Sequence, residues 1–145
     1  LFEKPRVIWR FGEERGGDIC TLEVYSDSDW AGCRKTRKST SGGVVVLGGS
    51  VLKSWSSTQK TIATSSGEAE CYALTKAAAE GLGVQSVAAD WGYPLDLRDW
   101  VESTAAKAVA SRTGRGKVRH LEVRYLWVQE ALKVGRLQVR KITGT

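Results

Sequence analysis

Apolar and polar residues alternate along much of the first half of the chain, as they do in β-strands with one buried face. A β-branched run before positions 48 and 49 favours a buried strand, and the two glycines at those positions predict a tight turn into the next strand. The strands expected from these patterns cover residues 7–11, 22–26, 42–47 and 51–55.

Helical spacing replaces the alternation after Ser65. Apolar residues recur every three or four positions among many alanines and predict a helix over residues 66–90. Ser65 and Glu68 form an S-x-x-E capping box that should start this helix. The remaining expected elements are a strand over residues 95–101, a short helix over 103–110, an amphipathic helix over 118–134 that Gly135 ends, and a last strand over 137–142.

This order of elements favours one mixed sheet of about five strands with helices packed on its faces, an α/β fold. A chain of 145 residues that is 41% hydrophobic is the size of a single domain, so residues 1–145 are expected to form one unit. The chain starts with Leu1 and contains no methionine, which indicates a piece of a longer product with residues 1–19 as the lead-in.

The cysteine content and the net charge indicate which cellular compartment and which partners to expect. The three cysteines are odd in number and lack CxxC spacing, so we expect a reducing, intracellular compartment, and no apolar run approaches the roughly 20 residues of a membrane span. The net charge is +6, and two basic clusters could bind phosphate backbones or be ordinary solvated surface. These clusters are Arg34, Lys35, Arg37 and Lys38, and then Arg112, Arg115, Lys117, Arg119 and Arg124.

Three carboxylates occupy positions suited to metal-dependent chemistry. Hydrolysis of a phosphodiester by two magnesium ions needs carboxylates from different segments to converge on ions roughly 3.5 to 4 Å apart. Asp27 ends one expected strand, Glu102 ends another, and Glu70 lies in the first turns of the long helix. Each has a plainer interpretation as well: Asp27 as a turn acid, and Glu102 as a charge that favours the start of the next helix. Because Glu68 is occupied at the helix start, Glu70 is the acid freer to bind metal.

Seven motifs follow one another in register along most of the chain. They are YSDSDWAG (25–32), RKSTSGG (37–43), WSSTQ (55–59), SSGEAECYAL (65–74), VESTAA (101–106), RHLEVRYLWVQE (119–130) and RLQVRKI (136–142). In these motifs the chain resembles the ribonuclease H domain of copia-type retrotransposon polyproteins. The resemblance implies a ribonuclease H-like fold and an endonuclease that cleaves the RNA strand of RNA/DNA hybrids.

The resemblance also assigns roles to the carboxylates. Asp27 and Glu70 match the family's catalytic Asp and Glu, whereas Glu102 stands where the family has Asp. The three would hold two Mg²⁺ ions, with Mn²⁺ as a substitute, and Glu122 is a candidate fourth ligand or a solvated helix acid. The family's own fourth carboxylate lies on a helix after the last strand, in a segment that we expect to be missing here. One extra methylene can misplace a ligand by about an ångström, so a catalytically inactive module within a larger assembly is the alternative.

The expected substrate surface lies around the hairpin. A hybrid would be bound through its backbones and 2′-hydroxyls, with low sequence specificity. The residues expected to contact it are Arg37, Lys38, Ser39, Thr40, Ser41, Gln59 and Lys60, although an ordinary polar loop explains them equally well. Other expected partners are the reverse transcriptase domain of the same polyprotein or subunits of a larger complex.

Overall fold

The computed structural model describes residues 18–102 and 119–142, with the side chains of the second stretch described from residue 126 onward. The strand expected over residues 7–11 and the helix expected over 103–110 lie outside the described residues. No helix in these two stretches is long and apolar enough to cross a membrane.

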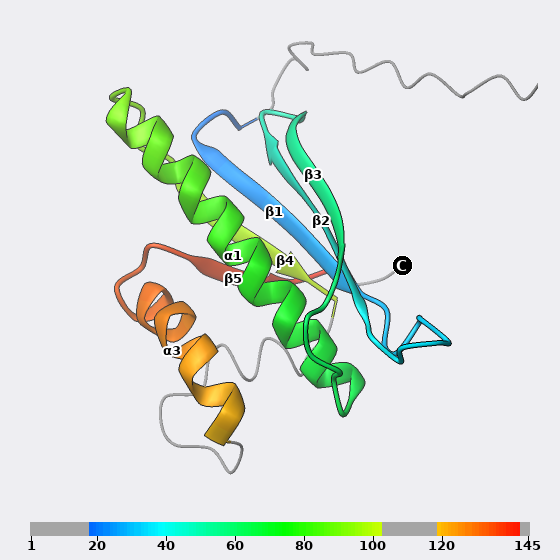
Figure 1. Cartoon of the computed structure of the whole chain (residues 1–145). Coiled ribbons are helices and arrows are strands. Elements are labelled where there is room, and N and C mark those ends of the chain that lie inside the picture. Colours follow the sequence, from blue (N-terminus) through cyan, green and yellow to red (C-terminus); the bar gives the residue numbers. More distant parts are fainter. Residues whose placement is uncertain (1–17, 103–118, 143–145) are drawn as a thin grey trace, which may run out of the picture.

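The described residues form a five-stranded mixed sheet with the order β3-β2-β1-β4-β5 (Figure 1). The strands are β1 (Thr21–Ser28), β2 (Thr40–Leu47), β3 (Ser50–Thr58), β4 (Asp96–Val101) and β5 (Gln138–Lys141). Strand β2 pairs antiparallel with β1 and with β3, while β1, β4 and β5 run parallel to one another. Parallel strands end at the same edge of a sheet, so the residues that end β1, β4 and β5 are brought together.

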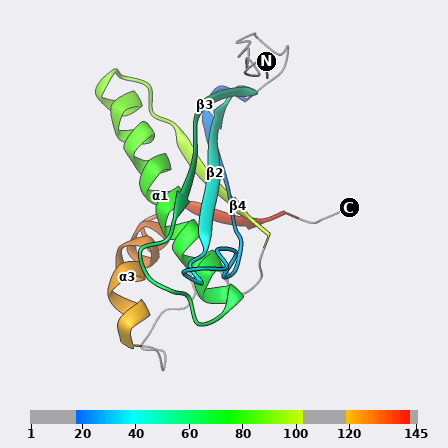
Figure 2. The same ribbon diagram turned by 45° about the vertical axis from the view of Figure 1, so that its right-hand side comes forward.

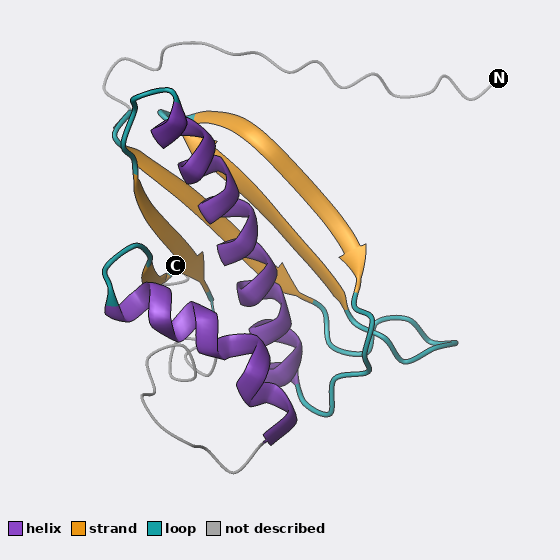
Figure 3. Ribbon diagram, turned by 60° about the vertical axis from the view of Figure 1, so that its left-hand side comes forward, coloured by secondary structure: helices purple, strands orange, loops and turns teal. Residues whose placement is uncertain are grey.

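Two helices, α1 (Ser66–Asp90) and α3 (Arg119–Lys133), lie on one face of this sheet (Figures 2 and 3). The main core joins Leu22, Val24 and Leu97 of the sheet to Ala77 of α1 and Val128 of α3. Small residues on α1 allow the helix to approach the strands closely. A Cβ atom at Gly81 of that helix would lie 2.7 Å from a methyl group of Leu97, the second residue of β4.

Most elements expected from the sequence are confirmed; β1, β2 and β3 are longer than expected, and β4 and β5 are slightly shorter. Helix α1 has the expected bounds, and the N–H of Glu68 donates to the Ser65 hydroxyl at 3.2 Å, which is the first half of the capping box. The second half is shifted by one residue, because the Glu68 carboxylate accepts from the N–H of Thr64 at 2.7 Å. Gly135 follows α3 with a φ of +73°, as expected of a glycine that ends a helix.

The other face of the sheet, which we call the open face, is not covered by α1 or α3. Side chains alternate along a strand, so Glu23, Tyr25 and Asp27 of β1 point to this face while their neighbours point to the helices. Tyr25 stacks in parallel on Trp100 of β4, with ring centroids 6.2 Å apart. The Trp100 indole N–H donates to the Glu23 carboxylate at 3.3 Å, which fixes the aromatic pair in place.

Candidate active site

Two of the expected catalytic carboxylates meet at the edge where β1 and β4 end, which we call the carboxylate edge. Asp27 is the penultimate residue of β1 and Glu102 directly follows β4, and both side chains are exposed. They line a common pocket of about 360 Å³. Its lining consists of Tyr25, Ser26, Asp27, Gly42, Gly43, Val44, Glu102 and Ile142.

The two glycines of this lining have different roles. Gly42 of β2 lies directly opposite Asp27 in the ladder, so no side chain of β2 stands next to the carboxylate. Gly43 points to the helix side, where a Cβ atom would lie 2.2 Å from the Trp55 ring. A side chain at position 43 would therefore displace Trp55 from the core that it packs against.

Glu70 lies apart from this pocket, in the second turn of α1. Helix α1 starts near the carboxylate edge (Figure 1), but Glu70 is not among the residues that line the pocket. Its Oε2 atom is buried and has no hydrogen-bond partner among the described residues. A buried carboxylate oxygen without a partner is costly, and a bound cation would relieve that cost.

The donor chemistry of these acids suits Mg²⁺ or Mn²⁺, which prefer carboxylate oxygens. Within the described part of the chain, however, no three or more acidic, cysteine or histidine side chains are close enough together to hold one metal ion. The side chain of Glu122 lies outside the described residues. The structure thus brings together Asp27 and Glu102, and leaves Glu70 as a half-buried neighbour.

The cysteine next to Glu70 is not a competing ligand or nucleophile. Burial, together with the negative charges of Glu70 and Glu68, raises the pKa of the Cys71 thiol to about 11. The thiol is therefore protonated at neutral pH, whereas metal binding and nucleophilic attack need the thiolate.

A further carboxyl group that the sequence analysis overlooked lies in the core. Asp99 of β4 points to the helix side, between the buried residues Leu97 and Val101, and is 0% exposed. Neither of its oxygens has a hydrogen-bond partner among the described residues, and burial raises the pKa of this carboxyl well above its usual range. The spacing of Leu97, Asp99 and Val101 is the signal in the sequence that would have found it, since every second residue of a strand points to the same face.

The polar segment after β1 is held by its own side chains. The Asp29 carboxylate accepts from the N–H of Thr40, and the N–H of Asp29 donates to the Thr40 carbonyl at 3.1 Å. Ala31, which has a φ of +54°, donates its N–H to the Ser39 hydroxyl at 3.0 Å. Asp29 therefore has a structural role at the base of the loop.

Three of the seven residues expected to contact nucleic acid are turned into the protein. Ser39, Ser41 and Gln59 are 0%, 3% and 8% exposed. The Gln59 amide donates to the Ser41 hydroxyl at 2.9 Å and to the carbonyl of Ala69 at 2.8 Å, which ties the ends of β2 and β3 to α1. Because these side chains lie inside the fold, they would have to turn outward to touch nucleic acid, and direct contact by these three stays a prediction.

The other four expected contacts remain at the surface. Arg37 and Lys60 are exposed, and Lys38 and Thr40 are half-buried. Arg37 has a φ of +57°, so its place in the loop requires a backbone conformation that is uncommon for residues other than glycine. Together with Arg34 and Lys35, Arg37 and Lys38 form a basic loop beside the carboxylate edge.

Solved structures with this architecture are ribonucleases H. Ribonuclease H1 LC11, isolated from compost, superposes with a TM-score of 0.62 at 17% identity, over 85% of this chain and 84% of that one. The same enzyme in complex with RNA/DNA hybrid gives 0.53 at 14% identity, over 84% and 85% of the chains. The protease-reverse transcriptase of prototype foamy virus gives 0.57 at 14% identity, over 86% of this chain and 17% of that one. The chain has the ribonuclease H-like fold.

Sequence relatives place this fold in a retrotransposon setting. The chain is 29% identical over 132 residues to the retrovirus-related Pol polyprotein from transposon TNT 1-94 of Nicotiana tabacum, and 29% identical over 127 residues to that from transposon RE1 of Arabidopsis thaliana. These matches cover 88% and 85% of this chain, but it spans only about a tenth of the polyproteins' own length. No protein-family model matches the chain. The expected relationship is confirmed: the chain's homologues are copia-type Pol polyproteins from plant transposons, and its structural neighbours are ribonuclease H domains.

Proposed function

We propose that this chain is a divalent-metal-dependent endonuclease that cleaves the RNA strand of RNA/DNA hybrids, as part of a retrotransposon polyprotein. The observation that carries the proposal is the pocket shared by Asp27 and Glu102 at the ends of two parallel strands. Support also comes from the fold and from its likeness to an enzyme solved in complex with RNA/DNA hybrid.

In this proposal Asp27 and Glu102 hold the ions from the sheet, and Glu70 holds them from α1. Divalent ions bound there would supply an activated water and stabilise negative charge on the phosphate. The protein's own contribution is to fix the carboxylates. Pairing in the ladder holds Asp27 opposite Gly42, and the rigid first turns of α1 hold Glu70. The basic loop would bind the backbone without reading its sequence.

The test is cleavage of a labelled hybrid by the chain with Mg²⁺ or Mn²⁺, compared with its Asp27→Asn variant. The matched control is Asp96→Asn, which removes an exposed carboxylate from the opposite end of β4. We expect cleavage by the chain and by the control, and loss of cleavage in Asp27→Asn. Equal cleavage by all three proteins, or none by any of them, would contradict the proposal. Duplex DNA and duplex RNA as parallel substrates test the choice of hybrid.

A second function is favoured by the same geometry. Glu102 stands where related domains are expected to have Asp, and Glu70 does not reach the pocket lining. A module with this constellation that binds nucleic acid without cutting it would serve a larger assembly. Hybrid binding that is unchanged by Asp27→Asn, together with no cleavage under any metal, would support this second function over the first.

A further inference from the structure

Strand β5 also ends at the carboxylate edge. It runs parallel to β4, and the N–H of Ile142 donates to the carbonyl of Val101 at 2.9 Å, which extends the pairing by one residue. Ile142 lines the pocket together with Asp27 and Glu102. The last residues of β5 therefore lie next to the candidate site, on the side away from β2.

Two cations stand at this end of β5. Arg140 lies opposite Trp100 in the ladder and points to the open face, whereas Lys141 lies opposite the buried Val101 and points to the helix side of this edge strand. Both side chains are exposed. The Arg140 guanidinium donates to the neutral side chain of Gln138 at 3.4 Å. Among the described side chains the one ion pair joins Lys53 to Glu80, so no described acid neutralises either cation of β5.

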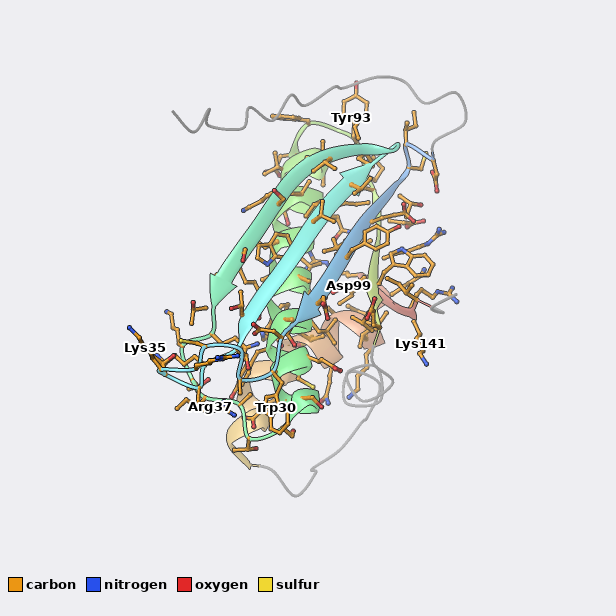
Figure 4. The ribbon with its side chains drawn as sticks, turned by 90° about the vertical axis from the view of Figure 1, so that its right-hand side faces the viewer. Trp30, Lys35, Arg37, Tyr93, Asp99 and Lys141 are labelled. Atoms are coloured by element: carbon orange, nitrogen blue, oxygen red, sulfur yellow. The ribbon has the colours of Figure 1, made fainter. Side chains whose placement is uncertain are left out.

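The carboxylate edge consequently lies between two groups of positive charge. The basic loop stands on its β2 side and Lys141 on its β5 side (Figure 4). The carboxylates themselves repel a phosphate backbone, so a polyanion that crosses the edge needs cations beyond it on each side. Between the edge and Arg140, the fixed Tyr25 and Trp100 rings present aromatic surface on which sugar rings can pack.

We propose that Arg140 and Lys141, one on each face of the edge strand β5, hold the nucleic-acid backbone where it passes the end of this strand on the β5 side of the pocket. This inference rests on the proposed function, since it takes the same hybrid as the ligand. The hybrid would then be held at two separated places, by the basic loop and by the end of β5, with the cleavage site between them.

The test is binding of a fluorescently labelled RNA/DNA hybrid in EDTA, where no cleavage occurs, at several salt concentrations. The double variant Arg140→Ala/Lys141→Ala is compared with Lys133→Ala/Arg136→Ala. The control pair removes the same charge from exposed positions before β5, at the opposite edge of the sheet. Thermal unfolding of both variants, measured in parallel, checks that the fold is retained.

We expect the β5 variant to bind on the order of 10-fold more weakly at moderate salt, and the slope of log K against log salt to fall by about 1 to 2, because each lost phosphate contact removes roughly one released counterion. The control should retain the affinity and slope of the unchanged chain. Equal losses in both variants would show a general charge effect, and unchanged binding in both would show that β5 makes no contact. Either result overturns the inference, whereas the proposed function is decided separately by the Asp27→Asn cleavage assay. A large fall in melting temperature in the β5 variant alone would also overturn it, because that result would mean that these two side chains support the fold.

Discussion

Asp27 and Asp99 are carboxyl groups on neighbouring strands of one sheet, and they differ in almost every physical respect. Asp27 lies on the open face at the end of β1, exposed to solvent and beside a pocket. Asp99 lies on the helix face in the middle of the core, with no described partner for either oxygen. The difference comes from strand parity alone, and it teaches that a carboxylate near a candidate site contributes to chemistry only if it lies on the correct face. Asp27 can bind a cation, whereas the buried carboxyl group of Asp99 destabilises the fold.

The largest expected effect is the difference in hybrid cleavage between variants of Asp27 and Asp99. Asp27→Asn should reduce hybrid cleavage by on the order of 100-fold or more, because it removes a charged ligand from the pocket. Asp99→Asn should leave cleavage within about a factor of two, since Asp99 has no access to the pocket. Initial rates of hybrid cleavage measure both. A comparable loss of cleavage in the two variants would contradict the conclusion that only Asp27 acts in the pocket.

The next effect concerns the length of the acid at the carboxylate edge. Glu102→Asp shortens the side chain by one methylene and should raise cleavage by on the order of 10-fold or more, if the extra length is what misplaces the ligand. The readout is the cleavage rate as a function of Mg²⁺ and Mn²⁺ concentration. No gain at any concentration of either ion would mean that the position of Glu102 does not limit the reaction.

A smaller effect is expected on stability. The pKa of Asp99 is raised by burial, so its contribution to stability is fully present below the ordinary pKa of an aspartic acid and is lost as the pH rises through the raised value. Asparagine cannot ionise. Asp99→Asn should therefore gain stability relative to the unchanged chain as the pH rises from 4 to 8.

Urea unfolding at pH 4, 6 and 8 measures this difference in the free energy of unfolding. Asp96→Asn is the control, because Asp96 is exposed on the same strand and should not change the pH dependence in this way. A constant difference between Asp99→Asn and the unchanged chain at all three pH values would show that Asp99 does not titrate as described.

The smallest effect concerns a buried polar group that does have partners. Gln59→Leu removes the hydrogen bonds to Ser41 and to the carbonyl of Ala69, and should destabilise the fold by about 1–2 kcal/mol. Lys60→Ala, at the exposed neighbouring position, should change stability by less than about 0.5 kcal/mol. Thermal unfolding distinguishes the two. A loss of hybrid binding in Gln59→Leu with unchanged stability would support Gln59 as a direct contact.

The elements of this fold could be predicted because they depend on local periodicity. Alternation located β1, and helical spacing with Ser65 located the start of α1. The expected site was only partly predictable, because the position of a carboxylate at the end of an element is visible in the sequence, whereas the carboxylates that it meets are not. Those neighbours depend on the register between β1 and β4, which are distant in the chain. Asp99 was overlooked although its spacing with Leu97 and Val101 is visible in the sequence, whereas the burial of Gln59 depends on contacts with Ser41 and Ala69 that local patterns do not contain.

The end of β5 shows the same limit. Arg140 and Lys141 are ordinary cations in the sequence of a short last strand. They become neighbours of the pocket only because β5 pairs parallel with β4. The pairing of strands that are distant in the chain decides which polar residues are buried and which charged residues lie together at an edge. Local sequence patterns do not contain this information.

The pairing of β1 with β4 also has a consequence for the order of folding. The hydrogen bond from Trp100 to Glu23 spans 77 residues, whereas the β2-β3 hairpin and α1 are built from contacts between nearby residues. Contacts that close long loops form slowly, because the entropy of closure is lost before the contact can stabilise the chain. In refolding, cleavage should therefore recover after the hairpin and helix signals. During synthesis the pocket is incomplete until β4 and the end of β5 have left the ribosome, so a growing chain can carry the hairpin and α1 while it still lacks a site.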